Sequence, residues 1–494
     1  MGSTLPNIVL IVLDTMGAKH MSLYGYPRLT TPNLERLAEE FKVFTRCYAT
    51  SCWTIPSHAS MFTGLYPSQH GAHEANLSLD VRCRHLATVL KQMGYRNYGF
   101  SANCLVSPQN GLCPDFDEFN EFDYDPHFMR FEQPENKARQ EFLTQLILKP
   151  VSWEKFLFFL RYLLDSKDYE VPYQYVKRWL GRFFRLTPLQ RSWPSSLKIM
   201  QKCFEIILQH QKSFPTPYFI FINIIEPHQH YNPPRLFRKY SSLYSWQKIS
   251  TLKFHSPVYA DKAKELLPEY VNLYDDEIIT TDSLLATLLK NLKSLNSFDN
   301  TMVILTSDHG EHFGEKGHYE HRLSLYNELL WVPLMVKFPG SAHRGIDNRL
   351  ASLNDLFATI MEVCQCAVPV PPSSVSLVGA NKRSETLSMI VGGEYLWKDL
   401  PELRNENLPS SKFAVILDEG WKLIQREDDV LEVYNLALSQ EEAKDLAPSL
   451  PADILRHFEE LINSYIKEID YQVQRYSDKG PAQSYKNVMW LNKL

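Results

Sequence analysis

Three residues carry side chains suited to binding a divalent cation, namely Asp14, Asp308 and His309. Asp14 ends the apolar run "NIVLIVLD", and the pair Asp308 and His309 ends the apolar run "TMVILTSDH". Two carboxylates and an imidazole suit a hard or borderline divalent cation. Such a cation keeps an open face and lowers the pKa of a bound hydroxyl, which makes that hydroxyl a nucleophile. Because an aspartate after a strand is also typical of a turn or a helix cap, this prediction requires the side chains to converge.

The candidate nucleophiles lie in the stretch "SCWTIPSHASMFTG", which holds Cys52, Thr54, Ser57 and Ser60 around Pro56. Proline is favoured in the first turn of a helix, so this pattern predicts a helix that begins near Thr54. The start of a helix presents unpaired N–H groups and the positive end of the helix dipole to an anion. The stretch therefore predicts an anion-binding helix start that carries the attacking group.

The elements that must position these residues alternate along the chain. Apolar runs such as "NIVLIVLD", "RNYGFSAN", "PYFIFINII" and "TMVILTS" are separated by helical patterns such as "TPNLERLAEEF" and "PEYVNLYDDEIITTDSLLATLLKNL". This alternation predicts an α/β fold with a mostly parallel sheet covered by helices on both faces. Ligands of such sheets bind beyond the carboxyl ends of the strands, and four ends carry polar residues: Asp14, Asn103, His228 and the pair Asp308 and His309.

Two regions depart from this pattern. Residues of about 125–214 read as helices rich in aromatic and basic residues, which predicts a helical insertion. Two interpretations remain open: a basic lid that contacts an anionic substrate or a membrane surface, or helices that pack on the main domain or on a second subunit of a homo-oligomer. Short alternating strands after about Pro369 predict a small antiparallel sheet. We therefore expect a catalytic domain over 1–370 and a C-terminal α+β subdomain over 371–494.

Composition narrows the class of protein further. A formal net charge of -5 over 494 residues gives no global field that would recruit nucleic acid. No segment reaches the roughly 18 uninterrupted apolar residues of a spanning helix, and the amino terminus lacks the layout of a signal peptide, so we expect no transmembrane segment and a cytoplasmic location. The eight cysteines do not form a disulfide framework in so long a chain, and most are expected to be buried thiols.

Eight segments of the chain, taken in order, resemble the sulfatase branch of the alkaline phosphatase superfamily. They are "NIVLIVLDT", "LYGYPRLTTPNLERLAEE", "TIPSHASMFTGLYPSQHG", "LATVLKQMGYRNYGF", "EPHQHYNPP", "TSDHGEHFGE", "HRLSLYNELLWVPLMVKFPG" and "GWKLIQREDDVLEVYNLALSQEEAKDLA". The resemblance covers nearly the whole chain, which makes it far more specific than any single motif. It implies an alkaline-phosphatase-like fold and the hydrolysis of a sulfate or phosphate ester.

The resemblance implies a role for each matching residue. Asp14, Asp308 and His309 match metal ligands, and Thr54 matches the nucleophile that also contacts the metal, because it lies two residues before Pro56. In sulfatases this position is a cysteine or serine that is oxidised to formylglycine. No formylglycine is expected here, because the β-carbon of threonine already bears a methyl group. The arginine that follows the family's Pro-Ser is replaced as well, by His58.

Two further departures concern the metal and the anion. Where sulfatases carry "GKWH" this chain has "GFSANC", so Asn103 takes that place, either as a donor to an oxyanion or as a turn residue. Thr15 replaces the second aspartate of the family's Asp-Asp pair. The loss of one hard ligand favours zinc or manganese, with calcium or magnesium as the alternatives.

The resemblance also implies basic residues near the transferred group. His228 matches a histidine that reaches this group or its leaving oxygen, whereas His230 is less well placed. His321 or Arg322 falls where the family keeps a basic residue near the anion, and Arg322 would be a charge-assisted donor. Both could instead lie on the surface. A second metal bound by His228 and His321 is the alternative to a single metal.

Together these residues predict a metal-dependent hydrolase of a small anionic ester. Thr54 would attack the sulfur or phosphorus atom, and water would release the covalent adduct, with His228 or a neighbour handling protons. The alternatives are phosphodiesterase, phosphonate hydrolase or phosphotransferase activity at the same site, or a catalytically inactive sulfatase-like binding protein.

Overall fold

A computed structural model describes residues 5–74, 76–122, 195–229, 231–242, 245, 260–321, 323–391 and 411–477. The chain forms two compact units, of which the first comprises residues 1–122 with 194–494 and the second residues 123–193. All of the described residues belong to the first unit. The account below therefore concerns this unit only.

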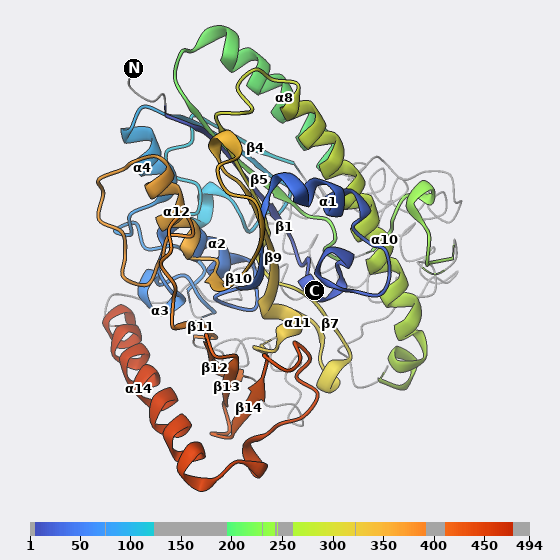
Figure 1. Ribbon diagram of the computed structural model, residues 1–494, viewed down its shortest axis with the longest axis vertical. Helices are drawn as coiled ribbons and strands as arrows, with labels where there is room; N and C mark the ends of the chain where they lie inside the picture. Colours follow the sequence, from blue (N-terminus) through green and yellow to red (C-terminus); the bar gives the residue numbers. More distant parts are fainter. Residues whose placement is uncertain are drawn as a thin grey trace, which may run out of the picture. The chain divides into compact units, whose positions relative to one another are not determined.

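The centre of the first unit is a sheet of eight strands in the order β10-β2-β9-β6-β1-β5-β3-β4 (Figure 1). The strands are β1 (Asn7–Leu13), β2 (Lys42–Tyr48), β3 (Arg96–Ser101), β4 (Glu118–Glu121), β5 (Tyr218–Ile224), β6 (Thr301–Ser307), β9 (Trp331–Lys337) and β10 (Gly345–Ser352). β9 runs antiparallel to β2 and β6, and the other neighbouring pairs are parallel. The predicted mostly parallel sheet is thus confirmed.

Helices cover both faces of this sheet, as Figure 1 shows. Since side chains alternate along a strand, Ile8, Leu10 and Val12 of β1 face one core, and Val9 and Ile11 face the other. The first core includes residues of α2 (Thr54–Thr63), α4 (Leu86–Gln92) and α12 (Asp355–Val363). The second includes residues of α1 (Pro32–Leu37), α8 (Ser195–Ser213) and α10 (Ala260–Lys293).

A small antiparallel sheet follows in the order β11-β12-β13-β14. Its strands are β11 (Glu385–Met389), β12 (Ser411–Leu417), β13 (Trp421–Arg426) and β14 (Leu431–Asn435). The long helix α14 (Ala452–Ser477) and the short α3 (Pro67–His70) contact each other, and α14 packs on β12 and β13. The remaining short elements are α11 (Asn327–Leu330), β7 (His312–Phe313) and β8 (Tyr319–Glu320). The predicted C-terminal antiparallel sheet is therefore present.

Strand register brings the predicted polar strand ends to one edge of the large sheet. Leu13, the last residue of β1, pairs with Ile224 of β5 and with Ser307 of β6. Ser101, the last residue of β3, pairs with Asn223 of β5. The residues that follow β1, β3, β5 and β6 therefore emerge side by side.

Three other predictions concern the cysteines, membrane-spanning helices and the location of the protein. All eight cysteines are free, and five of them are buried. Among the described residues, no helix combines the length and the apolar character that crossing a membrane requires. The predicted cytoplasmic location stays a prediction.

The predicted insertion at about 125–214 lies largely outside the described residues. Its described end, α8, packs on β3 and β5 of the large sheet and on α10. The predicted roles of the insertion, as a lid, a membrane contact or an oligomer interface, stay predictions.

Candidate active site

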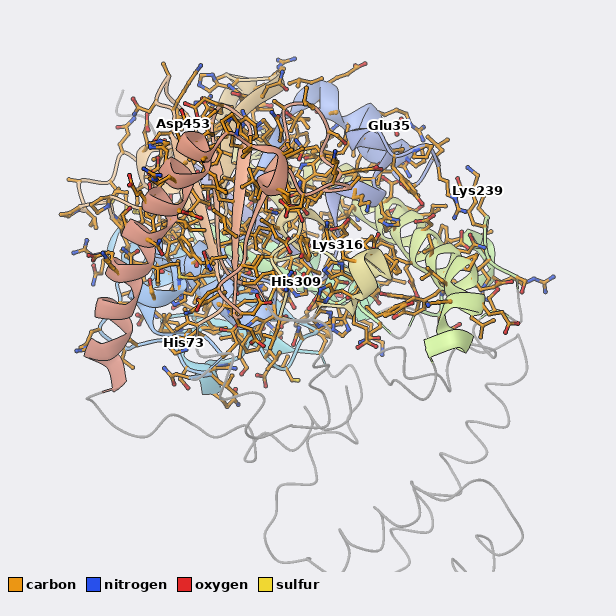
Figure 2. The ribbon with its side chains drawn as sticks, turned by 90° about the horizontal axis from the view of Figure 1, so that it is seen from below. Glu35, His73, Lys239, His309, Lys316 and Asp453 are labelled. Carbon is orange, nitrogen blue, oxygen red and sulfur yellow. The ribbon has the colours of Figure 1, made fainter. Side chains whose placement is uncertain are left out.

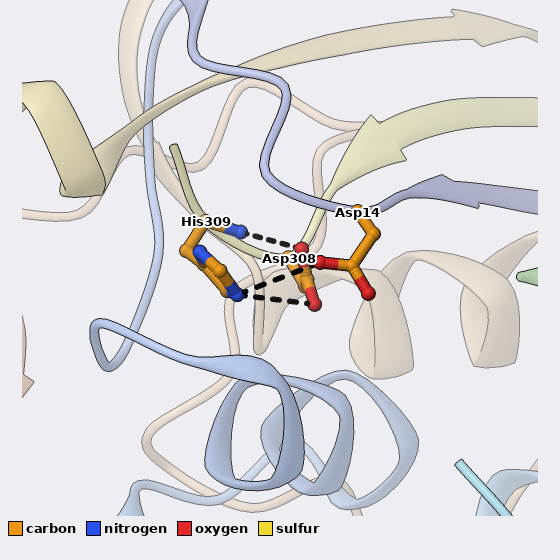
Figure 3. Close-up of side chains that lie close together, drawn as sticks. All are labelled: Asp14, Asp308 and His309. Carbon is orange, nitrogen blue, oxygen red and sulfur yellow. Dashed lines mark hydrogen bonds and ion pairs between the residues drawn. The ribbon is translucent and has the colours of Figure 1, made fainter. Parts of the chain in front are cut away.

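Asp14, Asp308 and His309 meet at the carboxyl edge of the large sheet, and their donor atoms all lie within 4.8 Å of one another. Asp14 follows β1 and Asp308 follows β6, two strands that pair in register up to their last residues. All three side chains are fully buried, and Figure 3 shows them turned toward a common point. The convergence that the sequence prediction required is therefore present in the structure.

Each of these three side chains uses one polar atom on the protein and leaves another without a partner. Asp14 Oδ2 accepts from Asn103 Nδ2 at 2.5 Å, Asp308 Oδ1 accepts from the His309 N–H at 2.9 Å, and His309 Nδ1 donates to the Gly310 carbonyl at 2.9 Å. Asp14 Oδ1, Asp308 Oδ2 and His309 Nε2 have no hydrogen-bond partner among the described residues. Buried polar atoms are rarely left unpaired, so three that face one another indicate a ligand.

The electrostatics of the site point to a cation. Burial raises the pKa of Asp308 to about 7. Burial, and after it the charge of Asp308, also raises the pKa of Asp14. Burial lowers the pKa of His309 to about 4, so the imidazole offers a lone pair on Nε2. Two buried carboxylates and a neutral imidazole fit a divalent cation, which would offset the repulsion between the carboxylates.

Thr54 begins α2 beside this donor set. A hydrogen bond between the Thr54 hydroxyl and the Asp308 carboxyl lowers the pKa of Asp308. Burial has the larger effect and raises this pKa. The N-cap residue of this helix, Trp53, makes no capping hydrogen bond through its side chain. The first N–H groups of α2 are thus available to an anion that approaches Thr54. Cys52 is also buried, and burial raises the pKa of its thiol, which disfavours the thiolate nucleophile.

A second group of polar residues adjoins His309. The ring of His321 lies 4.8 Å from that of His309 and 5.0 Å from that of His228, measured between centroids. His321 Nδ1 contacts Glu311 Oε1 at 2.9 Å, and the Tyr231 hydroxyl donates to Glu311 Oε2 at 2.9 Å. The predicted His228 and His321 are therefore close to His309, one of the three donors.

Figure 2 labels His309, which lies toward the middle of the view, whereas Lys239 and Glu35 lie toward its edge.

Comparison with known proteins identifies the family. A family model described as Sulfatase matches residues 6–365. The chain belongs to the sulfatase family. An N-acetylglucosamine-6-O-sulfatase of Bacteroides thetaiotaomicron is 22% identical over 89% of this chain and 84% of its own. An arylsulfatase of Clostridium perfringens is 23% identical over 98% of this chain and 99% of its own.

A solved structure with the same fold is the phosphonate monoester hydrolase of Agrobacterium radiobacter. It superposes with a TM-score of 0.65 at 17% identity, covering 94% of this chain and 96% of that chain. At this identity the likeness concerns the fold. Membership of the sulfatase family identifies the chain as a sulfatase-like hydrolase of sulfate esters.

Asn103 lies against a metal-ligand candidate of this sulfatase and not in open space. Its Nδ2 donates to Asp14, and its Oδ1 accepts from the Leu105 N–H at 2.9 Å, which is the pattern of an Asx turn. Of the two interpretations left open by the sequence, the turn is present. The geometry gives Asn103 a further contact with Asp14, whereas the predicted oxyanion contact stays a prediction.

Two predicted residues lie outside the described residues, and two further histidines of the same loop contact each other. Arg322 and His230 are not among the described residues, and their predicted roles stay predictions. His312 is buried and contacts the Ser324 hydroxyl at 2.6 Å, and the ring of His318 lies 5.2 Å from that of His312. These two histidines form a pair of their own.

Sequence reasoning missed Asn223, which is fully buried on β5 and lies 3.3 Å from His58 Nε2 through its Nδ2. Its signal was available, since it is the one polar residue within the apolar strand "YFIFINI". Sequence reasoning also missed the packing of Gly310, the glycine that follows Asp308 and His309. A Cβ on Gly310 would lie 2.0 Å from the Glu328 carbonyl oxygen, so a close backbone approach fixes the strand end that carries the donors.

Proposed function

We propose that this protein hydrolyses sulfate or phosphate esters of small molecules, with Thr54 as the nucleophile. The observation that carries this proposal is the position of Thr54, at the uncapped start of α2 and beside three buried donor atoms without hydrogen-bond partners. The Thr54 oxygen would form a bond to the sulfur or phosphorus atom while the bond to the ester oxygen breaks. The alcohol would leave, and water would then release sulfate or phosphate from Thr54.

The proposal includes a divalent cation held by Asp14, Asp308, His309 and the Thr54 hydroxyl. When bound, it would supply positive charge that lowers the pKa of the Thr54 hydroxyl and offsets the charge of the ester oxygens. Two carboxylates with one imidazole favour zinc or manganese, and calcium or magnesium remain the alternatives. A formylglycine is not part of the proposal, since Thr54 cannot be oxidised to an aldehyde at a β-carbon that bears a methyl group.

The chain's own residues supply the remaining functions. The first N–H groups of α2 would bind the ester oxygens, because the N-cap residue Trp53 makes no capping hydrogen bond through its side chain. His228, whose ring is partly exposed and whose Nδ1 contacts the Gln229 carbonyl at 2.6 Å, has its Nε2 left for moving a proton at the ester oxygen. Arg322 would add a charged donor to the anion.

A second metal at His228 and His321 is supported by one observation. Metal-binding histidines typically donate their other ring nitrogen to a carboxylate or a carbonyl. His321 Nδ1 contacts Glu311, and His228 Nδ1 contacts the Gln229 carbonyl, so both rings have this arrangement. The metal content of the purified protein, near one or near two equivalents, decides between the two sites.

A phosphorus centre is the second candidate for the reaction. It is favoured by the threonine at the nucleophile position and by the structural likeness to a phosphonate monoester hydrolase. This candidate includes phosphodiesterase, phosphonate hydrolase and phosphotransferase activities. All of them use the same Thr54 and the same donors.

One experiment tests the function and separates these candidates. Purified protein is assayed with nitrophenyl sulfate, phosphate, phosphodiester and phosphonate, and with N-acetylglucosamine 6-sulfate because one relative bears that name. We expect one class to be turned over, with activity lost on chelation and restored by zinc or manganese. Thr54→Ala should lose at least about a thousandfold in kcat, and Thr54→Ser should keep measurable activity. Full activity of Thr54→Ala would overturn the proposal.

The rival from another class is a binding protein that keeps the fold without chemistry. It predicts no turnover of any ester in this panel and no metal in the purified protein. The enzyme is favoured because a hydroxyl, that of Thr54, adjoins three buried donor atoms that have no hydrogen-bond partner among the described residues.

A further inference from the structure

His58 is fully buried and lies on the same helix as the candidate nucleophile, Thr54. It is one turn along α2 from Thr54, and its Nδ1 lies 2.9 Å from the Thr54 carbonyl oxygen. The same Nδ1 lies 3.7 Å from Asp308 Oδ2. One nitrogen atom of His58 therefore faces both the nucleophile residue and a metal-ligand candidate.

The hydrogen bonds around His58 determine which ring nitrogen carries the proton. The Thr54 carbonyl oxygen, 2.9 Å from His58 Nδ1, can only accept, so the ring proton resides on Nδ1. The other ring nitrogen, Nε2, then accepts from the Asn223 amide, whose Nδ2 lies 3.3 Å away, while Asn223 Oδ1 lies 3.3 Å from the Ser101 hydroxyl oxygen. His58 Nδ1 thus donates toward the Thr54 carbonyl, with Asp308 Oδ2 next to it.

The same chain of contacts reaches the other carboxylate of the site. The Ser101 hydroxyl lies 2.8 Å from the Asn103 carbonyl oxygen, and the Asn103 amide donates to Asp14. Polar contacts therefore run from Asp14, just after β1, through the end of β3 and Asn223 of β5, to His58 on α2. Aromatic packing holds the ring from the side, since Phe221 meets it edge-on at 6.0 Å between centroids.

We propose that His58 is a positioning residue, which with Asn223 holds the start of α2 and the Thr54 hydroxyl in place against Asp308. This inference rests on the proposed function, in which Thr54 attacks the ester. A nucleophile must be held within a fraction of an ångström of its reactive position, and polar groups behind a catalytic residue typically contribute about 10- to 100-fold. His58 acts through Thr54 and does not touch the substrate.

Two substitutions of the same residue test the direction of the contact. His58→Asn places an amide near the position of Nδ1 and can donate to the Thr54 carbonyl, whereas His58→Gln places its amide near the position of Nε2 and cannot. We expect His58→Gln, His58→Ala and Asn223→Ala to lower kcat about 10- to 100-fold with KM within about threefold of the wild type. His58→Asn should keep kcat within about threefold of the wild type.

A matched control separates positioning from general stability. Asn97 is another fully buried asparagine, at the opposite end of β3, where its Nδ2 donates to the Ala87 carbonyl at 2.7 Å. Asn97→Ala should lower the melting temperature as Asn223→Ala does and leave kcat unchanged. The double variant His58→Ala, Asn223→Ala should lose no more kcat than the worse single variant, because both residues act as one unit.

The outcomes distinguish this inference from the proposed function. Metal content is measured in every variant, and the assay uses the ester that the wild type turns over fastest. Wild-type kcat in His58→Ala, or equal losses in His58→Asn and His58→Gln, would overturn the positioning role. If Thr54→Ala keeps full activity, the proposed function itself fails. An inactive Thr54→Ala together with the predicted order of the His58 variants supports both.

Discussion

His309 Nε2 lies 3.6 Å from Asp308 Oδ2 and 3.8 Å from Asp14 Oδ1. None of these three atoms has a hydrogen-bond partner among the described residues. These contacts are too long for hydrogen bonds. The two carboxylates themselves have oxygen atoms within 4.8 Å of each other, a distance at which two negative charges repel. The protein thus holds two buried carboxylates together at a cost that a bound cation would offset.

The repulsion between the two carboxylates predicts that Asp14→Asn stabilises the metal-free protein and removes the stabilisation by added metal. Asp14→Asn removes one of the two like charges, so the metal-free protein should gain about 1–2 kcal/mol in the free energy of unfolding at pH 8. The rise in melting temperature on adding zinc or manganese should disappear, together with activity. Thermal melts with and without chelator measure both effects.

The control for this prediction is another buried aspartate. Asp276 is fully buried, accepts from the N–H groups of Lys239 and Ser241, and is not one of the three grouped donors. Asp276→Asn should lower stability and leave the metal-induced shift intact. A metal-free Asp14→Asn protein that is less stable than the wild type would contradict the repulsion between the carboxylates.

The close approach at Gly310 predicts a steric effect. A Cβ at Gly310 would lie 2.0 Å from the Glu328 carbonyl oxygen and 3.1 Å from Gly17 Cα, so Gly310→Ala must move backbone next to His309. We expect a loss of about 3 kcal/mol or more in stability and weaker metal binding. At Gly17 a Cβ would meet the same oxygen at 3.4 Å, so Gly17→Ala should cost much less. Chelator competition and melting curves compare the two variants, and equal effects would exclude the steric explanation.

A buried ion pair of the C-terminal region contacts α11, the short helix that precedes β9 of the large sheet. Lys422 of β13 lies 2.6 Å from Glu442 Oε1 and donates to Asn327 Oδ1 at 2.9 Å, with both charged side chains fully buried. Lys422→Met leaves the buried Glu442 charge without its counterion and should cost about 3–5 kcal/mol. The double variant Lys422→Met, Glu442→Gln should recover part of this loss, which denaturant unfolding measures. Additive losses would show that the pair is not coupled.

Lys337 predicts a pH dependence of stability. It is 1% exposed and donates to the Phe298, Asp299 and Thr301 carbonyls, and burial lowers its pKa to about 8. Between pH 8 and about 10.5 the unfolded chain keeps this proton while the folded protein releases it, so stability rises with pH in this window.

Lys337→Met tests this contribution, because it removes the titrating group. The stability of the wild type relative to Lys337→Met should grow by an amount on the order of 2 kcal/mol from pH 7 to pH 10. Urea unfolding at several pH values gives the difference. A constant or shrinking difference would contradict the lowered pKa.

Much of the site followed from the sequence, because each donor comes directly after an apolar strand. In a parallel sheet the strand ends share one edge, so Asp14 and Asp308 could be brought together without knowledge of the strand order. The start of α2 at Thr54 followed from Pro56. These inferences depend on local patterns and on one general property of α/β folds.

What the sequence could not provide depends on packing between distant segments. The contact of His58 with Asn223 depends on the rotation of α2 about its axis, which the strand pattern does not determine. The amide of Asn103 was free to face an anion or Asp14, and only the loop conformation decides. The direction of β9 relative to its neighbours could not be predicted either, because an apolar run such as "WVPLMVK" fits a parallel or an antiparallel strand.

The position of β6 between β1 and β9 has a consequence for the order of assembly. Asp308 and His309 are synthesised nearly three hundred residues after Asp14, so a growing chain that ends before Thr301 holds one of the three donors. Closing such a long loop is slow, because the chain loses conformational entropy before the strands pair. In the proposed function, metal uptake therefore requires that β6 has joined β1.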